Sequence, residues 1–167
     1  MPEESFKELI NKNLYQVFLF ACRAGLPFSF SSHPWFVCAK KGELSRWEIL
    51  FRKNQCPTCW GHLHLNYLPP TSGIEVSPVT FKTLTFLNKH YWQGEIVNQL
   101  EGSDNSVAHK MIEFIENSKS VYPFCDKYSF FGPNSNTYAE WVIEHFPESN
   151  FKLPKNSFGR YYADKIK

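Results

Sequence analysis

The apolar segments of this chain are short, and this limits what the chain can fold into. The longest, Leu14 to Ala24, has about eleven residues and is interrupted by Gln16 and Arg23. A helix that crosses a bilayer needs about 20 consecutive apolar residues, so we expect no membrane span. Short runs of aromatic and β-branched residues are typical of buried strands. The pattern therefore predicts a globular domain that contains a sheet.

Composition supports a single folded domain over residues 1–167. Hydrophobic residues make up 43% of the chain, which is enough for one core, and the aromatic content of 17% excludes a natively unfolded protein. The net charge of +2 comes from scattered charges, so we expect no nucleic-acid partner. The open candidates are a small-molecule, peptide or lipid ligand. No cofactor is predicted, and the oligomeric state stays open.

The N-terminus and the cysteines indicate an intracellular, reducing location. The chain starts with Met1-Pro-Glu-Glu, which is acidic where a secretory signal would be basic. Five cysteines are an odd number in a chain without a signal, so reduced thiols are expected rather than a disulfide framework. We predict a cytoplasmic protein.

Several segments have the pattern of strands. Residues 14–22 follow a short predicted helix over 3–13 and form a compact aromatic and β-branched run. Residues 33–40 and 45–52 flank Lys41-Gly42-Glu43, which predicts an antiparallel hairpin. Residues 61–68 alternate polar and apolar, which predicts a strand with one wet face, and 128–131 look extended. Residues 79–87 and 90–100 stay open between strand and loop.

Two segments have the pattern of helices. Apolar residues from Val107 to Ile115 recur at helical spacing, after a cap at Ser103 or Asp104. A second helix is predicted over 138–146. Together these elements predict an α+β fold, an antiparallel sheet packed with a few helices.

The loop Gly132-Pro-Asn-Ser-Asn-Thr137 leads directly into this second helix. Unpaired amides and the helix dipole at such a position stabilise an anion, so Ser135 is the candidate nucleophile. Asn134, Asn136 and Thr137 are the candidates that bind the oxyanion or shape the site. The alternative is that these residues only cap the helix, since Thr137 and Glu140 fit a capping box.

His33 is the candidate base, because a histidine that titrates near neutrality is the usual partner of a hydroxyl nucleophile. Possible orienting residues are His64, His62 and Glu48. A lone histidine is more often structural, and this alternative stays open.

The segment Cys56-Pro-Thr-Cys59-Trp-Gly-His62-Leu-His64 places two thiols and two imidazoles within nine positions. Such a pair of thiols suits zinc, although the short span from Cys59 to His62 and His64 would crowd a tetrahedral site. A thioredoxin-like redox role requires the two cysteines at a strand-to-helix junction. The residues after Cys59 alternate polar and apolar like a strand, which disfavours this role. Metal binding therefore stays an alternative here, and the leading prediction is no metal.

One set of aromatic side chains could either line a ligand groove or pack in the hydrophobic core. A domain with so many aromatic residues must bury most of them, so we expect the core. The set comprises Phe28, Phe30, Trp35, Trp47, Trp60, Tyr91 and Trp92.

The C-terminal part of the chain contains an ordered set of short motifs, Tyr122-Pro-Phe, Gly132-Pro-Asn-Ser-Asn-Thr137, Trp141-Val142, Pro147-Glu148, Leu153-Pro154 and Gly159. In these motifs it resembles a bacterial family known as domain of unknown function 3750. Upstream, His33-Pro-Trp-Phe-Val and the region from Tyr91-Trp92 through Gly102 are also similar to that family. The likeness covers most of residues 14–160, loosely between 50 and 90. The Cys56-Pro-Thr-Cys59 segment lies in this loose part, which disfavours metal further.

The order of parts is also similar to permuted papain-like hydrolases, which include the PPPDE group and NlpC-type proteins. These place a histidine on an early strand and Asn-Cys-Asn at the start of a later helix. The resemblance implies a papain-like, circularly permuted architecture, with Ser135 at the position of the cysteine and His33 at that of the base. A serine alkoxide is not formed at neutral pH, so Ser135 requires better proton transfer than a cysteine would.

Three functions follow as hypotheses. The first is an amide or ester hydrolase or acyltransferase that acts through Ser135 and His33. The second is a catalytically inactive module that binds a ligand in the same groove. The third is a domain stabilised by zinc at Cys56 and Cys59.

Overall fold

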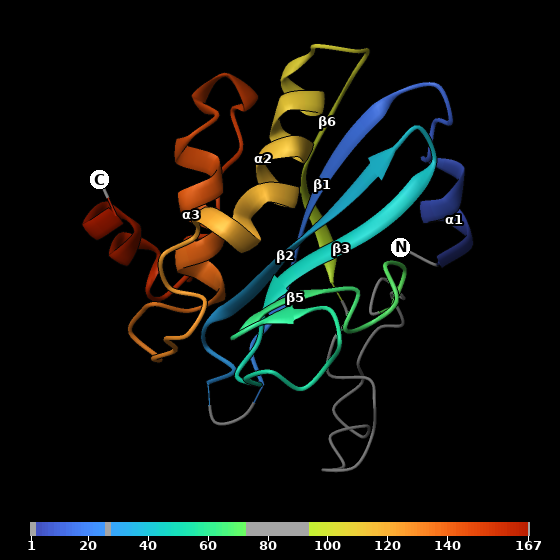
Figure 1. Ribbon diagram of the computed structural model, residues 1–167. Helices are drawn as coiled ribbons and strands as arrows, with labels where there is room; N and C mark the ends of the chain where they lie inside the picture. The colour runs from blue at the N-terminus through green and yellow to red at the C-terminus, as the bar shows by residue number, and fades with distance from the viewer. Residues whose placement is uncertain (1–2, 26–27, 73–93, 167) are drawn as a thin grey trace.

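The computed structural model describes residues 3–25, 28–72 and 94–166. Within these ranges, six strands form one antiparallel sheet in the order β4-β5-β3-β2-β1-β6. Figure 1 shows α2 and α3 on one side of this sheet and α1 on the other. The strands are β1 (Tyr15–Arg23), β2 (Ser32–Lys40), β3 (Glu43–Ile49), β4 (Cys59–Trp60), β5 (Leu63–Leu65) and β6 (Glu95–Gly102). The helices are α1 (Glu3–Glu8), α2 (Val107–Val121) and α3 (Ser135–Glu144), with 3-10 helices η3 (Pro147–Ser149) and η4 (Arg160–Ile166).

The mixed α and β architecture with an antiparallel sheet is confirmed. Both faces of the central strands are apolar, because the sheet is covered on both sides. On β2, Phe36 and Cys38 join the core under α2 and α3, whereas Trp35 and Val37 join the cluster that includes Phe6 of α1. This explains why β1 and β2 are continuous apolar runs rather than alternating ones.

The predicted hairpin is confirmed. Strands β2 and β3 pair antiparallel, with Lys40 opposite Glu43. Lys41 and Gly42 form the two-residue turn between them, and both have positive φ, 51° and 93°. Such turns match the twist of the flanking strands, and glycine adopts positive φ without a steric penalty.

Both predicted helices exist, but their starts differ from the prediction. The N-cap of α2 is Ser106, whose side chain accepts a hydrogen bond from the His109 amide, rather than Ser103 or Asp104. Helix α3 begins at Ser135, three residues before the predicted start. The N-terminal helix α1 ends at Glu8 and is shorter than expected.

The interpretation of residues 61–68 as one strand with a wet face is wrong. Only Leu63–Leu65 forms a strand there, as β5, while β4 precedes the segment, and the side chains of His62 and His64 are buried. Residues 128–131 contain no strand. Residues 79–87 lie outside the described residues, as does the start of 90–100, whose later part belongs to β6.

The expectation of reduced thiols is also wrong for one pair. The structure joins Cys56 and Cys59 in a disulfide, whereas Cys22, Cys38 and Cys125 are free. Within the described ranges, no helix is long and apolar enough to cross a bilayer.

We predict that Leu19→Ala lowers the free energy of unfolding by about 2–5 kcal/mol, since Leu19 is fully buried in β1 and its truncation leaves a cavity. Leu9→Ala is the matched control, because Leu9 is 38% exposed, and it should change stability by less than about 1 kcal/mol. Urea denaturation measures both variants. Equal losses would contradict this description of the core.

Candidate active site

Ser135 is the first residue of α3, and the Asn134 side chain fixes the start of this helix. Asn134 Oδ1 accepts hydrogen bonds from the amides of Asn136 at 3.0 Å and Thr137 at 3.2 Å. The Thr137 hydroxyl in turn accepts from the Asn134 amide at 3.1 Å. This is a capping box, but it joins Asn134 to Thr137, so the predicted box of Thr137 with Glu140 is wrong.

The same residues bind the helix start to distant parts of the chain. Asn136 Nδ2 donates to the carbonyl oxygens of Ser32 and Phe158, at 3.0 and 2.9 Å. Asn134 Nδ2 donates to the carbonyl oxygen of Phe158 at 3.1 Å, and the Thr137 hydroxyl donates to that of Gly159 at 2.8 Å. Gly159 has a φ of 89°, and a Cβ there would meet the Asn134 side chain. The start of α3 is therefore held against the beginning of β2 and the C-terminal tail.

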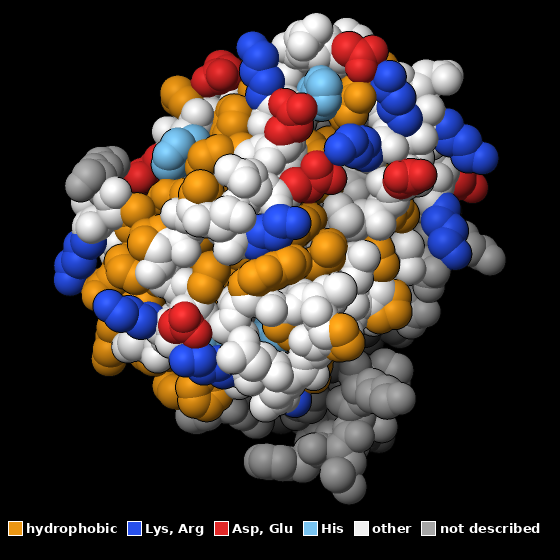
Figure 2. Space-filling view, viewed as in Figure 1, with side chains coloured by type: hydrophobic (Ala, Val, Ile, Leu, Met, Phe, Trp, Pro, Cys, Tyr) orange, Lys and Arg blue, Asp and Glu red, His pale blue; other side chains and the backbone are white. Residues whose placement is uncertain are grey.

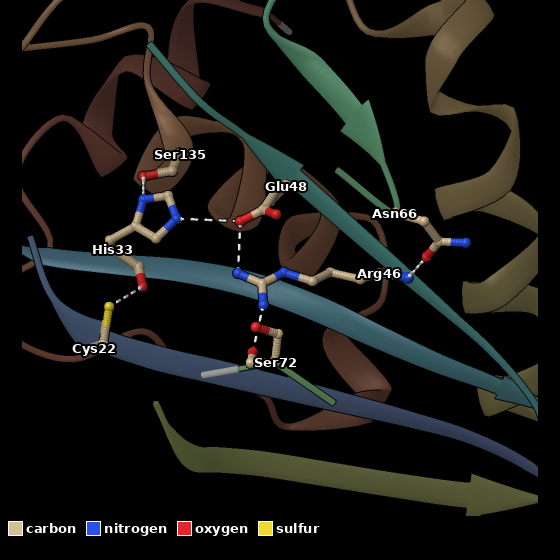
Figure 3. Close-up of polar contacts among 7 residues, drawn as sticks. All are labelled: Cys22, His33, Arg46, Glu48, Asn66, Ser72 and Ser135. Carbon is tan, nitrogen blue, oxygen red and sulfur yellow. Dashed lines mark hydrogen bonds and ion pairs between the residues drawn. The ribbon is translucent and has the colours of Figure 1, made fainter. Parts of the chain in front are cut away.

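This arrangement brings His33 and Ser135 together, although 102 positions separate them in the chain. His33 lies near the start of β2, and its Nδ1 is 3.0 Å from Ser135 Oγ. Figure 3 shows the imidazole between the hydroxyl and the carboxylate of Glu48 on β3. His33 Nε2 lies 3.6 Å from Glu48 Oε2. The three side chains form an ordered row of hydroxyl, imidazole and carboxylate.

Glu48 is a buried carboxylate with a buried cationic partner. Arg46 donates to Glu48 Oε2 at 2.8 Å and to the Ser72 carbonyl oxygen at 2.7 Å (Figure 3). Its guanidinium lies 4.4 Å from the Trp35 ring centroid. Burial raises the pKa of Glu48, but the neighbouring His33 imidazole and the charge of Arg46 outweigh it and lower the pKa from its usual value of 4.5. Glu48 is therefore ionised at neutral pH.

Sequence reasoning did not identify Arg46. The available signal was strand alternation, since residues 46 and 48 lie on the same face of β3. A carboxylate and a guanidinium two residues apart in an apolar hairpin strand indicate a buried pair, because neither charge can be buried alone.

The two other candidates for the orienting role lie elsewhere. His62 Nδ1 contacts the Leu50 carbonyl oxygen at 2.8 Å, and its ring stacks on Phe51. His64 lies opposite Glu48 in the β3–β5 register, and its ring nitrogens contact Cys56, Cys59 and the Arg52 carbonyl oxygen. Burial lowers the pKa of His64. Of the three candidates, the structure places only Glu48 beside Nε2 of His33.

The amides at the start of α3 are only partly available to an anion. Those of Asn136 and Thr137 bind the Asn134 side chain, so an oxyanion would have to displace that carbonyl oxygen. The Ser135 amide, at the first helical position, is the remaining candidate donor. Asn134, Asn136 and Thr137 thus shape the site through their hydrogen bonds.

Exposed phenylalanine rings lie beside this site. Phe28, Phe30, Phe131 and Phe158 are 40%, 54%, 75% and 43% exposed, and each contacts the Phe130 ring. Phe130 and Phe158 also accept hydrogen bonds from Asn134 through their carbonyl oxygens. We call these five residues the phenylalanine cluster. Figure 2 shows hydrophobic side chains at the lower left, where Figure 1 draws the loop that precedes α3. The core interpretation holds for Trp35 and Trp47 but is wrong for Phe28 and Phe30, while Tyr91 and Trp92 lie outside the described residues.

We predict that Asn134→Ala lowers the free energy of unfolding by about 1–2 kcal/mol, because two helix amides lose their acceptor. Asn134→Asp keeps the acceptor but sets a carboxylate oxygen against the carbonyl oxygens of Phe130 and Phe158, so its loss should shrink in acid, where the carboxyl group can donate. Guanidinium denaturation compares the variants. An alanine variant as stable as the wild type would contradict the cap.

We predict that Glu48→Gln destabilises the protein in a pH-dependent manner. The folded pKa of Glu48 is depressed, so its stabilisation is present above about pH 4.5 and is lost as the pH falls through the folded pKa. The variant should be about 3 kcal/mol less stable than the wild type at pH 7, and the difference should shrink in acid.

The matched control for this prediction is Glu116→Gln, which removes the solvent-exposed ion pair with Lys40 and should cost at most about 1 kcal/mol. Unfolding measured from pH 7 to pH 3 tests both variants. A pH-independent effect of Glu48→Gln would show that the carboxylate charge is not what stabilises the fold.

The comparisons with known proteins match one family. Residues 73–162, just over half of the chain, match the family described as Protein of unknown function (DUF3750). This region contains Ser135 and its neighbours, whereas His33 and Glu48 precede it. No curated protein and no solved structure matches the chain. The expected resemblance is therefore confirmed for the C-terminal part, and the chain belongs to the DUF3750 family.

Proposed function

We propose that the protein is a serine hydrolase or acyltransferase that attacks an ester or amide carbonyl through Ser135. The observation that carries the proposal is the 3.0 Å contact between Ser135 Oγ and His33 Nδ1 at the start of α3. A base within hydrogen-bond reach of a hydroxyl is the first requirement for a serine nucleophile.

The row of side chains provides a path for the proton. Glu48 lies on the Nε2 side of His33 and favours the tautomer with hydrogen on Nε2, which leaves Nδ1 unprotonated to accept the Ser135 proton. Ser135 Oγ then bonds to the carbonyl carbon, and the negative charge moves to the carbonyl oxygen. The Ser135 amide and the dipole of α3 stabilise this oxyanion. The bond between the carbonyl carbon and the leaving group then breaks, and His33 gives its proton to that leaving group. In the second half, His33 takes a proton from water, the water oxygen bonds to the acyl carbon, and the proton returns to Ser135 Oγ as the acyl group leaves.

The phenylalanine cluster favours a substrate with an apolar group. Exposed aromatic rings that contact one another beside a polar site suit an acyl chain or an apolar side chain. The carbonyl oxygens of Phe130 and Phe158 accept hydrogen bonds from Asn134, so the backbone that carries two of these rings is attached to the residue that precedes the nucleophile.

A papain-like, circularly permuted architecture is part of the same proposal. It is supported by the order of the site residues in the chain. His33 lies on β2, an early strand of the antiparallel sheet, and Asn134-Ser135-Asn136 stands at the start of the later helix α3.

We predict that a fluorophosphonate probe labels the wild type but not Ser135→Ala, and that His33→Asn lowers the labelling rate at least about 100-fold because the base is lost. Ser106→Ala is the matched control: Ser106 stands at the start of α2, where its hydroxyl caps the helix, and its removal should leave labelling unchanged. Activity-based labelling and hydrolysis of p-nitrophenyl acetate and octanoate measure these effects. Equal labelling of wild type and Ser135→Ala would overturn the proposal.

A second function, a binding module without turnover, is favoured by one observation. Ser135 is only 4% exposed, and two of the neighbouring amides bind the Asn134 side chain. These contacts suit a site whose hydroxyl and amides stabilise the fold and do not react with a substrate. In that case no probe labels Ser135, and Phe30→Ala or Phe131→Ala weakens binding of an amphiphilic aromatic dye, 8-anilinonaphthalene-1-sulfonate.

A further inference from the structure

A second group of chemically reactive side chains lies at the β4–β5 edge of the sheet. Nδ1 of His64 is 3.1 Å from Sγ of Cys59 and 3.4 Å from Sγ of Cys56. These three potential ligand atoms all lie within 4.8 Å of one another. Nothing in the proposed Ser135 chemistry uses them.

The hydrogen bonding of His64 shows which nitrogen is available. Nε2 lies 2.7 Å from the Arg52 carbonyl oxygen and must carry hydrogen, because a carbonyl oxygen can only accept. Nδ1 therefore has a lone pair, and it points at two sulfur atoms that have no proton to donate while they form a disulfide. Among the described residues, Nδ1 has no other contact that could supply a proton. His64 is fully buried, so this geometry matches the reduced pair better than the oxidised one.

The spacing between His64 Nδ1 and each sulfur atom suits a zinc ion, whereas the S–S bond has to break before both thiolates can bind one. Typical Zn–S and Zn–N bonds place a thiolate sulfur and an imidazole nitrogen about 3.6 Å apart in a tetrahedron, close to the two distances here. An imidazole whose second nitrogen donates to a backbone carbonyl is the usual form of a metal-bound histidine. His62 does not contribute, because its Nδ1 contacts Leu50.

We propose that reduced Cys56 and Cys59 bind one zinc ion together with His64. A phosphine or dithiol reductant supplies two electrons and breaks the S–S bond. Each thiol then loses its proton to solvent as zinc binds the two thiolates and the neutral imidazole. Cys56 and Cys59 are only partly buried, so a water molecule completes the coordination. This site is independent of the proposed hydrolase function.

The proposed ion would stabilise the edge of the sheet that backs the candidate active site. His64 pairs with Glu48 across β5 and β3, and Cys59 pairs with His64 across β4 and β5. A metal bound by Cys59 and His64 therefore joins the two short strands beyond β3, which make few backbone contacts of their own.

The test measures zinc in the full chain, purified with a phosphine reductant, and counts free thiols in the same sample. We expect about one zinc per chain and a higher melting temperature that a chelator reverses. After unfolding in the presence of a chelator, the same sample should contain five titratable thiols, against three if Cys56 and Cys59 had stayed joined. Cobalt substitution should give sulfur-to-metal charge-transfer bands with intense tetrahedral d–d bands. Cys56→Ser with Cys59→Ser should abolish the zinc and the bands, and His64→Gln should lower zinc content and change the bands.

Two matched controls keep the test specific. His62→Gln and Cys125→Ser remove the same residue types nearby without removing a proposed ligand, so both should keep the wild-type zinc content. If His64→Gln fails to fold, the double cysteine variant decides, because Cys56 and Cys59 are partly exposed. The proposal is overturned if the native pair resists reduction, if the reduced protein holds no more zinc than the double cysteine variant, or if the controls lose zinc equally.

Discussion

The hydrogen bonds of Asn134 are the interaction on which the candidate site depends. One amide side chain accepts from two helix amides and donates to two carbonyl oxygens, in the loop before α3 and in the C-terminal tail. Because both ends of this side chain are used, the first turn of α3 cannot rotate without breaking several buried hydrogen bonds, each of which is costly to leave unmade. This rigidity holds the Ser135 hydroxyl in contact with His33.

The second constraint is the burial of two opposite charges. Arg46 and Glu48 are fully buried, and the guanidinium also binds Ser72 and stacks on Trp35. A buried pair of this kind is weak evidence for stability, since desolvation opposes the attraction. It does fix the charge state, because Arg46 helps to hold Glu48 ionised beside the imidazole. The proposed chemistry requires that state.

Local sequence patterns predicted a helix or strand correctly where an apolar face or a single turn was enough to define it. The β2–β3 hairpin followed from a glycine turn between apolar runs, and α2 followed from its apolar spacing. The N-cap residues were less predictable, because several consecutive polar residues before each helix have side chains that can accept a hydrogen bond from a helix amide. At α3, Asn134 rather than Thr137 is the N-cap, because the helix begins at Ser135 and Thr137 is its third residue.

The sequence by itself determined the residue types of the site, a hydroxyl at a helix start and an early strand histidine, because both follow from local pattern. Only the tertiary structure decided which carboxylate faces His33, that the polar side of residues 61–68 is buried, and that His64 rather than His62 meets the two cysteines. The physical reason is that burial and partner choice depend on which strands pair. Strand β5 lies against β3, and short-range periodicity carries no information about that pairing.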